Sequence, residues 1–425
     1  MVKVELEPVG EVPSRERLLD IERTNMMMAP GIATATFFRG DSVAAARVLK
    51  GRLELIVEAN PWLAGTLELQ GGTLELCYPE TVSTARLDEI FNPAKSKGTP
   101  CKKQLLLDST MDFGQICTAI KGTAAEVAPG SACKNKPFPL LALTVAPDAK
   151  GSAGFAVVVS ASHVILDGFG YYQLLAMLSG GEIAALSPRR KHEIAADNKV
   201  ASGAEEAAFV TSAGVMVNAI SGLLCGRTPA LGNHYVDAGR LAAEKDAALR
   251  DGGCDFVSTN DIVLSRFGAA VGARVMLMPI NWRGRLANYS ASDAGNYEGA
   301  LAFGPADYAQ PACVRRTLSS GPPVYRRGGA GHGAAPLEPL PGGCAAMCCR
   351  LGMVSNWTFG HFEEFCIDGC EHVLHVPHCD PAMVPFEFGV LYRPRKGKLA
   401  LASFTRACSS HAVHEKLPLG EPVRM

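Results

Sequence analysis

Residues 157–175, VVVSASHVILDGFGYYQLL, pass from a β-branched run into a helix-like stretch within a few residues. Valine-rich runs of this length are typical of buried strands. The segment behind Asp167 and Gly168 has the length and apolar spacing of an amphipathic helix. The sequence therefore predicts that His163 and Asp167 lie in a short loop, held between two rigid elements.

The same alternation of helix-period and β-branched stretches along the chain predicts a mixed α/β or α+β architecture. Residues 41–60 form a predicted helix capped by Asp41 or Ser42, with apolar side chains on one face: Val43, Val48, Leu49, Leu53, Leu55 and Ile56. Two alternating strands joined by Gly71-Gly72 predict a hairpin over 61–80. A capped helix is expected over 257–272, and further strands over 139–147, 151–163, 273–286, 350–359 and 397–407.

The length of 425 residues favours two domains over one. Residues 187–206 are polar and poor in large apolar side chains, which is typical of a linker. We therefore expect an N-terminal half over 1–190 and a C-terminal half over 207–425. Residues 319–346 are rich in glycine and proline and predict a long exposed loop.

Charge and hydropathy exclude several partners. The formal net charge of -1 gives no overall attraction to nucleic acid. The apolar runs 139–147 and 154–166 are too short to span a bilayer. The first 19 residues are charged and lack the apolar centre of a signal peptide, so we expect a cytoplasmic protein.

The chain contains 14 cysteines, which without a secretory signal are expected to be reduced. One segment, 366–379, combines residue types that suit zinc: Cys366, Cys370, His372, His375, His378 and Cys379. Its spacing follows none of the usual paired-ligand patterns, so we favour a strand with a polar face over a metal site.

The chemistry of the loop around His163 follows from its residue types. An imidazole can take a proton near neutral pH, because its ordinary pKa lies near 6.5. Asp167 could orient the ring or pair with a basic residue and brace the loop. Gly168 would let the backbone turn and leave room beside the histidine. The alternative is that His163 is a structural residue at the end of a strand, with its hydrogen bonds satisfied, and that Asp167-Gly168 is only a turn.

The pattern H-x-x-x-D-G at mid-chain resembles the signature of the HxxxD acyltransferase superfamily, which includes chloramphenicol acetyltransferase, condensation domains and the BAHD acyl-CoA transferases. Other segments that resemble BAHD motifs lie in the family's order along nearly the whole chain. NPWLAGTLE precedes His163, and VSTNDIVLSRF, INWRGRL, AGNYEGALAF and VSNW come after it. The resemblance implies two chloramphenicol acetyltransferase-like domains, each a mixed sheet flanked by helices, with a channel between them. It also implies a monomer that acts on a small-molecule acceptor and an acyl-CoA co-substrate, without a metal.

The resemblance assigns roles to particular residues. His163 would be the general base, and Ser355 and Trp357 would each donate a hydrogen bond to the tetrahedral oxyanion. Arg283, with Arg285 as second choice, would pair with Asp167. The phosphates of the thioester would be bound by a charged turn: Arg393, Arg395 and Lys396.

Two departures from the family leave alternatives open. The expected DFGWG segment is replaced by CIDGC, and Asp368 there stands in the wrong register to take over the acidic role. Ser162 occupies the position where condensation domains usually carry a first histidine, which disfavours a carrier-protein condensation domain. A carrier-protein-dependent enzyme, an inactive small-molecule-binding member and a metal-dependent hydrolase remain the rival readings.

Overall fold

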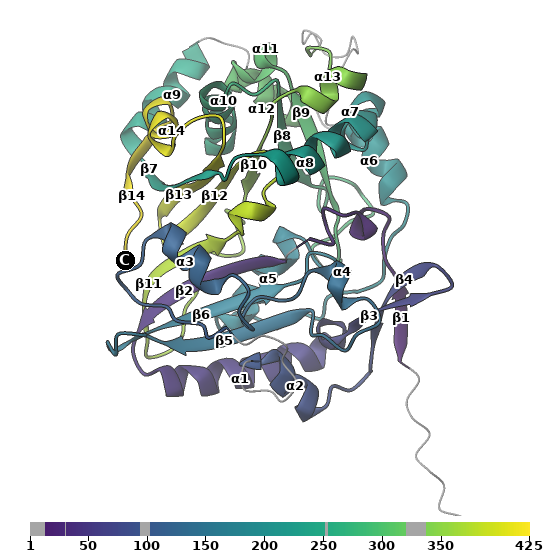
Figure 1. The fold of residues 1–425 in the computed structure, drawn as a ribbon, viewed down its shortest axis with the longest axis vertical. Coiled ribbons are helices and arrows are strands. Elements are labelled where there is room, and N and C mark those ends of the chain that lie inside the picture. Colours follow the sequence, from purple (N-terminus) through teal and green to yellow (C-terminus); the bar gives the residue numbers. More distant parts are fainter. Residues whose placement is uncertain (1–12, 30, 94–102, 251–253, 320–336) are drawn as a thin grey trace, which may run out of the picture.

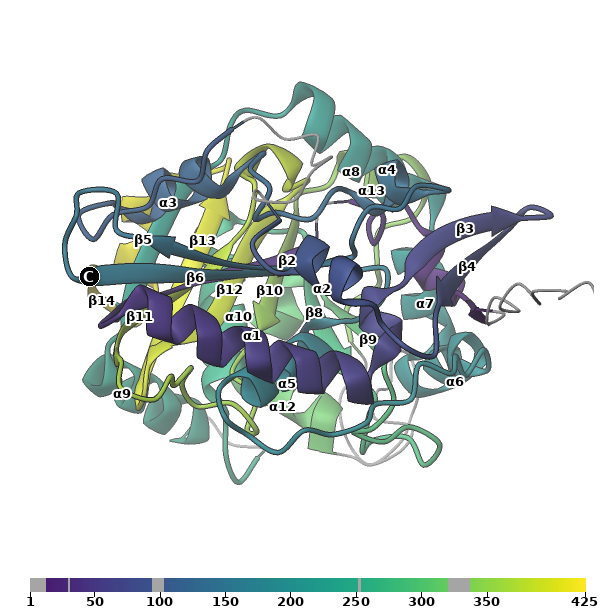
Figure 2. The ribbon, with the colours of Figure 1, turned by 90° about the horizontal axis from the view of Figure 1, so that it is seen from below.

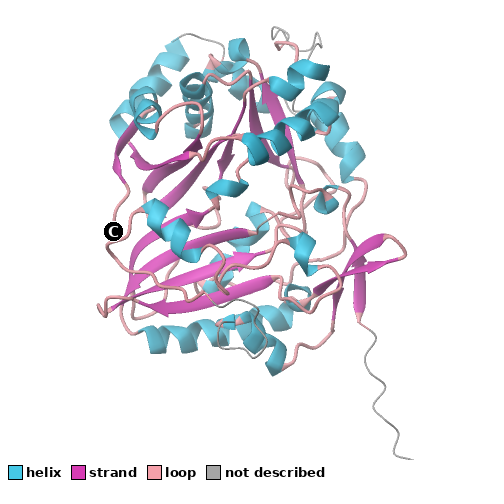
Figure 3. Cartoon of the chain, in the orientation of Figure 1, coloured by secondary structure: helices cyan, strands magenta, loops and turns pink. Residues whose placement is uncertain are grey.

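A computed structural model describes residues 13–29, 31–93, 103–250, 254–319 and 337–425. Sheets occupy the middle of the molecule and helices lie mainly on the outside (Figure 3). The mixed α/β class predicted from the sequence is confirmed. The described strands are β1 Ser14–Arg17, β2 Ile32–Arg39, β3 Thr66–Gln70, β4 Thr73–Tyr78, β5 Leu141–Pro147, β6 Gly154–Ala161, β7 Ala230–Val236, β8 Val275–Asn281, β9 Glu298–Phe303, β10 Leu351–Asn356, β11 Glu371–His378, β12 Glu387–Arg395, β13 Lys398–Thr405 and β14 Leu419–Pro422.

Helices α1 Ser42–Ala59, α5 Gly168–Leu178 and α10 Thr259–Val271 bury apolar side chains in the cores beside these sheets. The other described α-helices are α2 Thr84–Ile90, α3 Phe113–Ile120, α4 Gly130–Cys133, α6 Ile194–Ser202, α7 Ala204–Val210, α8 Ala213–Cys225, α9 Ala238–Arg250, α11 Pro305–Tyr308, α12 Pro311–Ser319, α13 Gly343–Cys348 and α14 Ser410–Lys416.

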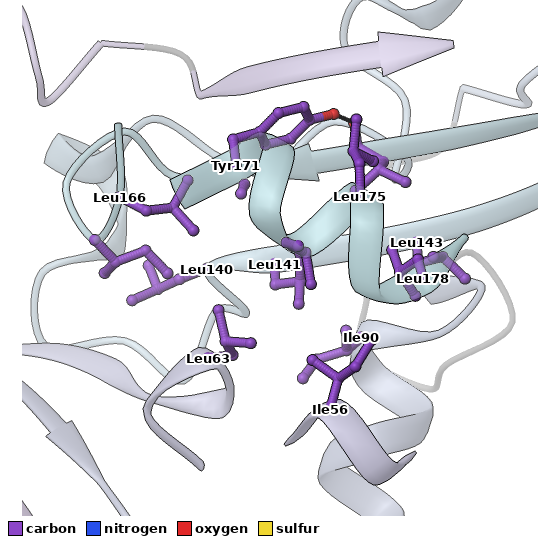
Figure 4. Close-up of a cluster of buried hydrophobic side chains, with 14 of the residues drawn as sticks. Ile56, Leu63, Ile90, Leu140, Leu141, Leu143, Leu166, Tyr171, Leu175 and Leu178 are labelled. Atoms are coloured by element: carbon purple, nitrogen blue, oxygen red, sulfur yellow. Dashed lines mark hydrogen bonds between the residues drawn. The ribbon is translucent and has the colours of Figure 1, made fainter. Parts of the chain in front are cut away.

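The first large sheet has four antiparallel strands in the order β11-β2-β6-β5. α1 lies across its outer face (Figure 2). Side chains of α1, α5 and β5 form one buried apolar cluster, of which Ile56, Leu141 and Leu175 are members (Figure 4). This packing fixes the direction of α5, and with it the loop that carries His163.

The second large sheet has seven strands in the order β14-β7-β13-β12-β10-β8-β9. β10 runs parallel to both β8 and β12, and the other pairs are antiparallel. Its main covering helix, α10, is the capped helix predicted over 257–272. It begins with a capping box, in which the side chains of Ser258 and Asp261 accept hydrogen bonds from each other's backbone N–H groups.

Strand β11 links the two large sheets, because it belongs to the C-terminal half of the chain but pairs with β2 in the first sheet (Figure 1). A third apolar cluster joins residues of both sheets, such as Phe37, Leu374 and Tyr392. The segment expected as a linker, 187–206, includes α6, whose Ile194 is buried. The domain limits at 190 and 207 stay a prediction, and β11 crosses that division.

The hairpin β3–β4 forms as predicted, and β1 pairs with β4 to make a small third sheet. Gly71 and Gly72 have φ values of 57° and 83°, the left-handed conformation that a two-residue hairpin turn requires at both positions. Figure 2 shows this hairpin extending away from the rest of the molecule.

The expected loop over 319–346 and the segment Ala204–Cys225 differ from what the sequence indicated. Of the loop expected over 319–346, residues 320–336 lie outside the described residues, and α13 begins before its expected end and continues to Cys348. Among the described residues, the stretch Ala204–Cys225 is long and apolar enough to span a membrane by length and composition, and 17% of its apolar 18-residue window is buried. The apolar runs named from the sequence do not include it. It consists of two helices, α7 and α8, and its composition alone assigns no membrane role.

Helix α1 forms over the predicted range, but its buried face differs from the predicted one. Asp41 caps it by accepting hydrogen bonds from the N–H groups of Val43 and Ala44. Leu49, Leu53 and Ile56 are buried as expected, whereas Val43, Val48 and Leu55 are exposed. Ala45 and Val57 complete the buried stripe instead, because the helix rotates 100° per residue and the sheet covers only one side.

Substitutions in α1 test this assignment of faces. Leu49 is completely buried and Val48 is 44% exposed. We expect Leu49→Ala to lower the free energy of unfolding by about 2–5 kcal/mol, since it leaves a cavity in the core. The neighbouring Val48→Ala should change it by less than about 0.5 kcal/mol. Urea denaturation of both variants is the measurement, and equal losses would contradict the observed orientation of α1.

Candidate active site

The loop that carries His163 runs from the end of β6 to the start of α5. Asp167 is the N-cap of α5, and its Oδ1 atom accepts a hydrogen bond of 3.0 Å from the N–H of Gly170. The predicted strand, loop and helix therefore form as the sequence indicates. The carboxylate's other oxygen remains available for a partner outside the loop.

That partner is Arg283, which follows the end of β8. Its Nη1 atom donates to Asp167 Oδ2 at 2.7 Å, and both side chains are 1% exposed. The same oxygen accepts a bond of 3.2 Å from the N–H of Tyr297. A buried ion pair of this kind is held in place only when its remaining donors and acceptors are also satisfied.

The guanidinium of Arg283 meets that condition. Its Nε and Nη2 atoms donate to the carbonyl oxygens of Asp293 and Gly295, at 2.9 and 2.8 Å. Nη1 also donates to Asn281 Oδ1 at 3.1 Å. The rings of Phe169 and Tyr297 lie 5.0 and 5.1 Å from its central carbon. Arg283 is thus committed to protein groups and binds the loop rather than a ligand.

A second buried ion pair, which the sequence interpretation missed, supports the same loop. Arg190 Nε donates to Glu22 Oε2 at 2.9 Å, and both side chains are fully buried. Arg190 Nη2 donates to the carbonyl of Ile165 at 3.0 Å. Asn296 bridges Glu22 and the carbonyl of His163, at 3.1 and 2.8 Å. The partners lie 168 residues apart in the sequence, so no local pattern could reveal them.

The loop opens onto a cavity of about 970 Å³, mainly apolar, which His163 and Gly168 line together with Ser355, Trp357 and Glu298. The volume is in the range of small-molecule sites. The cavity walls come from both large sheets and from α6 and α7. The structure therefore brings His163 and the Ser355–Trp357 segment to one cavity, as predicted.

Glu298, the first residue of β9, faces the imidazole across this cavity. Its Oε1 atom lies 4.0 Å from His163 Nε2, too far for a direct hydrogen bond. The pKa of Glu298 is raised to about 6, mainly because burial disfavours the charged form; His163 and Arg283 oppose the rise, and Asp167 adds to it. The Nδ1 atom of His163 is buried and has no hydrogen-bond partner among the described residues. The sequence interpretation assigned no role to Glu298.

Ser355 and Trp357 do not act as two independent donors. The indole Nε1 of Trp357 donates to Ser355 Oγ at 3.0 Å. The hydroxyl of Ser355 then keeps its own proton to donate into the cavity. Trp357 is fixed in turn by its backbone N–H, which donates to the carbonyl of Leu391 at 2.8 Å. The indole therefore orients the serine, and of these two side chains Ser355 is the one whose donor is left for a ligand.

Gly168 does not take the special backbone conformation that was expected of it. It is not among the described glycines with positive φ. A Cβ atom at this position would lie 3.6 Å from the ring of Phe359, an ordinary contact distance. The backbone turn thus needs no glycine here, although a side chain longer than alanine would enter the cavity.

The three cations expected to bind phosphates do not line the cavity. Arg393 donates to the carbonyls of Phe359 and Phe362, at 2.9 and 2.8 Å, and so holds the loop behind Trp357. Arg395 donates to the carbonyl of Arg424 at 3.3 Å, and Lys396 lies 3.6 Å from Glu363 at the surface. Lys199 is the one lysine or arginine among the described residues of the lining.

The cysteine and histidine cluster forms strand β11 and its flanks. His375 contacts Thr36 Oγ1 at 2.8 Å and the Tyr172 hydroxyl at 3.2 Å, and burial lowers its pKa to about 3. His378 contacts Glu126 at 3.0 Å in the cavity wall. Within the described ranges, no group of three or more histidine, cysteine or acidic residues is arranged to hold a metal ion.

Comparison with known proteins identifies the fold of the chain. No protein-family model and no curated protein sequence matches the chain. Solved structures do match along nearly the whole length, and they include BAHD acyltransferases and condensation domains. The chain therefore has the chloramphenicol acetyltransferase-like fold, as the sequence resemblance implied.

Three of these structures illustrate the match. F. graminearum TRI101 in complex with coenzyme A and T-2 mycotoxin has a TM-score of 0.58 at 14% identity, over 92% of this chain and 95% of its own. Polyketide synthase associated protein 5 from Mycobacterium tuberculosis has a TM-score of 0.57 at 16% identity, over 96% and 97%. Vinorine synthase has a TM-score of 0.55 at 13% identity, over 96% and 93%.

Breaking the Asp167–Arg283 pair should destabilise the protein. Asp167→Asn and Arg283→Gln each leave a buried charge without its partner, which costs about 3–5 kcal/mol of folding free energy. The double variant should lose less than the sum of the two, because it removes both charges. Urea denaturation of the four proteins measures this coupling, and strict additivity would contradict the brace.

A small side chain at position 168 should be tolerated. We expect Gly168→Ala to change the free energy of unfolding by less than about 0.5 kcal/mol, since the added Cβ meets only ordinary contacts. Gly168→Leu should weaken ligand binding, because the longer side chain would occupy part of the cavity beside His163. Gly31→Ala is the control, because its Cβ would lie 2.1 Å from the carbonyl oxygen of Ala161. Urea denaturation compares the stability of Gly168→Ala with that of Gly31→Ala. Equal losses in the two variants would contradict the open space observed at position 168.

Proposed function

We propose that this protein is an acyltransferase, which moves an acyl group from an acyl-CoA thioester to a hydroxyl or amine of a small-molecule acceptor. One observation carries the proposal: two buried ion pairs fix the His163 loop at the wall of a cavity of about 970 Å³. A histidine held in this way can act on a ligand without first paying the entropic cost of ordering its own loop.

His163 is the general base in this mechanism. Its Nε2 atom removes the proton from the acceptor as the acceptor's lone pair attacks the thioester carbon. The carbonyl oxygen becomes an oxyanion, to which the Ser355 hydroxyl donates a hydrogen bond. When the tetrahedral intermediate collapses, the thiolate leaves and takes the proton from the imidazolium. Both reactants are held in one cavity, so no acyl-enzyme intermediate is needed.

Asp167 is a positioning residue in this scheme. Its two oxygens are bonded to the Gly170 N–H and to Arg283, and they do not contact the imidazole. The carboxylate therefore holds the loop and α5 against β8, and it relays no proton. The proposal also includes the monomeric state and the cytoplasmic location expected from the sequence.

A carrier-protein thioester is the second candidate donor, and the scarcity of cations favours it. Coenzyme A carries a nucleotide with phosphates that commonly pair with lysine or arginine. Lys199 is the single such residue among the described lining, and it is exposed. Equal rates with acyl-CoA and acyl-pantetheine would indicate that the nucleotide is not bound, and would favour the carrier protein.

The experiment that tests the proposal is replacement of His163. We expect His163→Ala to lower kcat/KM for acyl transfer about 10²- to 10⁴-fold, as loss of a general base does. Its unfolding midpoint should hardly change, because the side chain is 25% exposed. The assay follows thiol release from a panel of acyl-CoA donors with alcohol and amine acceptors. His411→Ala is the control, since this histidine is 79% exposed on α14; near-normal turnover in His163→Ala would refute the mechanism.

A further inference from the structure

We propose that the acceptor is a cationic amine, whose ammonium group is held by the Glu298 carboxylate beside His163. This inference rests on the acyl transfer proposed above and names the acceptor class that the sequence left open. It follows from the surroundings of Glu298, from the distance between the two side chains and from the number of protons that amine acylation must remove.

Glu298 differs from the other acidic residues of the described cavity lining. Each of those has a partner within hydrogen-bonding distance: Asp20 with Arg23, Glu126 with His378, Asp167 with Arg283, and Asp380 with Lys121. Among the described residues, no lysine or arginine pairs with Glu298, and His163 lies 4.0 Å away. Its side chain is 23% exposed, and it lines the cavity.

A carboxylate in this position is costly for the empty protein. Removal from water penalises the charged form, which raises the pKa of Glu298 to about 6. The carboxylate is therefore largely ionised at neutral pH, in a mainly apolar cavity and without a bonded cation. A ligand with a positive charge would supply the missing partner, whereas a neutral hydroxyl would not.

The 4.0 Å between Glu298 Oε1 and His163 Nε2 suits one nitrogen atom that contacts both. Hydrogen bonds of about 2.9 Å to each atom place that nitrogen at the apex of a triangle over the gap. An ammonium group has three N–H donors, so it can bond to both acceptors at once. The nitrogen then lies at the catalytic imidazole while the rest of the ligand extends into the cavity.

The proton count gives an independent reason for two acceptors. An alkylamine is protonated at neutral pH, with a pKa of about 10 by analogy with lysine. It must lose one proton before it can attack and a second after the C–N bond has formed. His163 takes the first and Glu298 the second. The thiolate leaves with the proton from His163, and Glu298 releases its proton to water. A hydroxyl acceptor loses only one proton and needs His163 alone.

A rival interpretation is that Glu298 only adjusts the protonation of His163. The two interpretations differ in selectivity. If Glu298 acts through the histidine, its removal should affect amine and alcohol acceptors alike. If it binds the ammonium group, its removal should act on amines specifically, and in binding as well as in turnover.

The test measures equilibrium binding of a matched pair of probes, 2-phenylethylamine and 2-phenylethanol, by calorimetry without an acyl donor. We expect the full-length protein to bind the amine at least about 30-fold more tightly than the alcohol, as for a desolvated charge pair. Glu298→Gln should remove that preference. Amine affinity should also rise as the pH increases through about 6, where Glu298 ionises, and Glu298→Gln should reduce this rise to the part that comes from His163.

Asp20→Asn is the matched control, because it removes a carboxylate from the same lining that is already paired with Arg23. It should keep the amine preference and the pH dependence. Equal affinities for the two probes, including no binding of either, or a preference that survives Glu298→Gln, would overturn the inference. Because no acyl donor is present, these outcomes are separate from the His163→Ala assay, whose failure would refute acyl transfer itself.

Discussion

The buried ion pair between Asp167 and Arg283 is the interaction on which the site depends. It joins the start of α5, at the first large sheet, to the end of β8, in the second. The pair is favourable only because every remaining polar atom is bonded: Gly170 and Tyr297 complete the carboxylate, and three backbone or amide oxygens complete the guanidinium. A single contact thus sets both the orientation of α5 and the position of the His163 loop relative to the opposite wall.

Two other features reinforce this connection between the sheets. Strand β11 carries residues of the C-terminal half into the first sheet, and the Glu22–Arg190 pair binds the His163 loop to the segment that precedes β9. The cavity is therefore closed by parts of the chain far apart in sequence. Its walls cannot separate without breaking a strand pair or exposing a buried charge, so the geometry around His163 is preorganised in the folded protein.

The sequence predicted the features that depend on local pattern. The hairpin at Gly71-Gly72, the capped helix that begins near Ser258 and the strand–loop–helix around His163 all need only neighbouring residues. Arg283 was identified through the family resemblance, since no spacing rule relates it to Asp167. The cations at 393–396 were chosen for their charge, but Arg393 is used to hold backbone carbonyls and the others lie outside the cavity. Glu22, Arg190 and Glu298 were missed because their partners are set by tertiary contacts.

The two buried ion pairs and Glu298 differ in how far the fold depends on them. Asp167, Arg283, Glu22 and Arg190 are buried and bonded to protein groups, so substitution there costs folding free energy before it alters chemistry. Glu298 is different, because the backbone of β9 holds its position while its carboxylate has no hydrogen bond to any of the described residues and lies 4.0 Å from His163. An apolar or hydroxyl side chain at 298 would leave both ion pairs intact and change the charge beside His163. Under the proposed function, the acceptor class would therefore depend on a position that the ion pairs do not need, next to a histidine that they hold fixed.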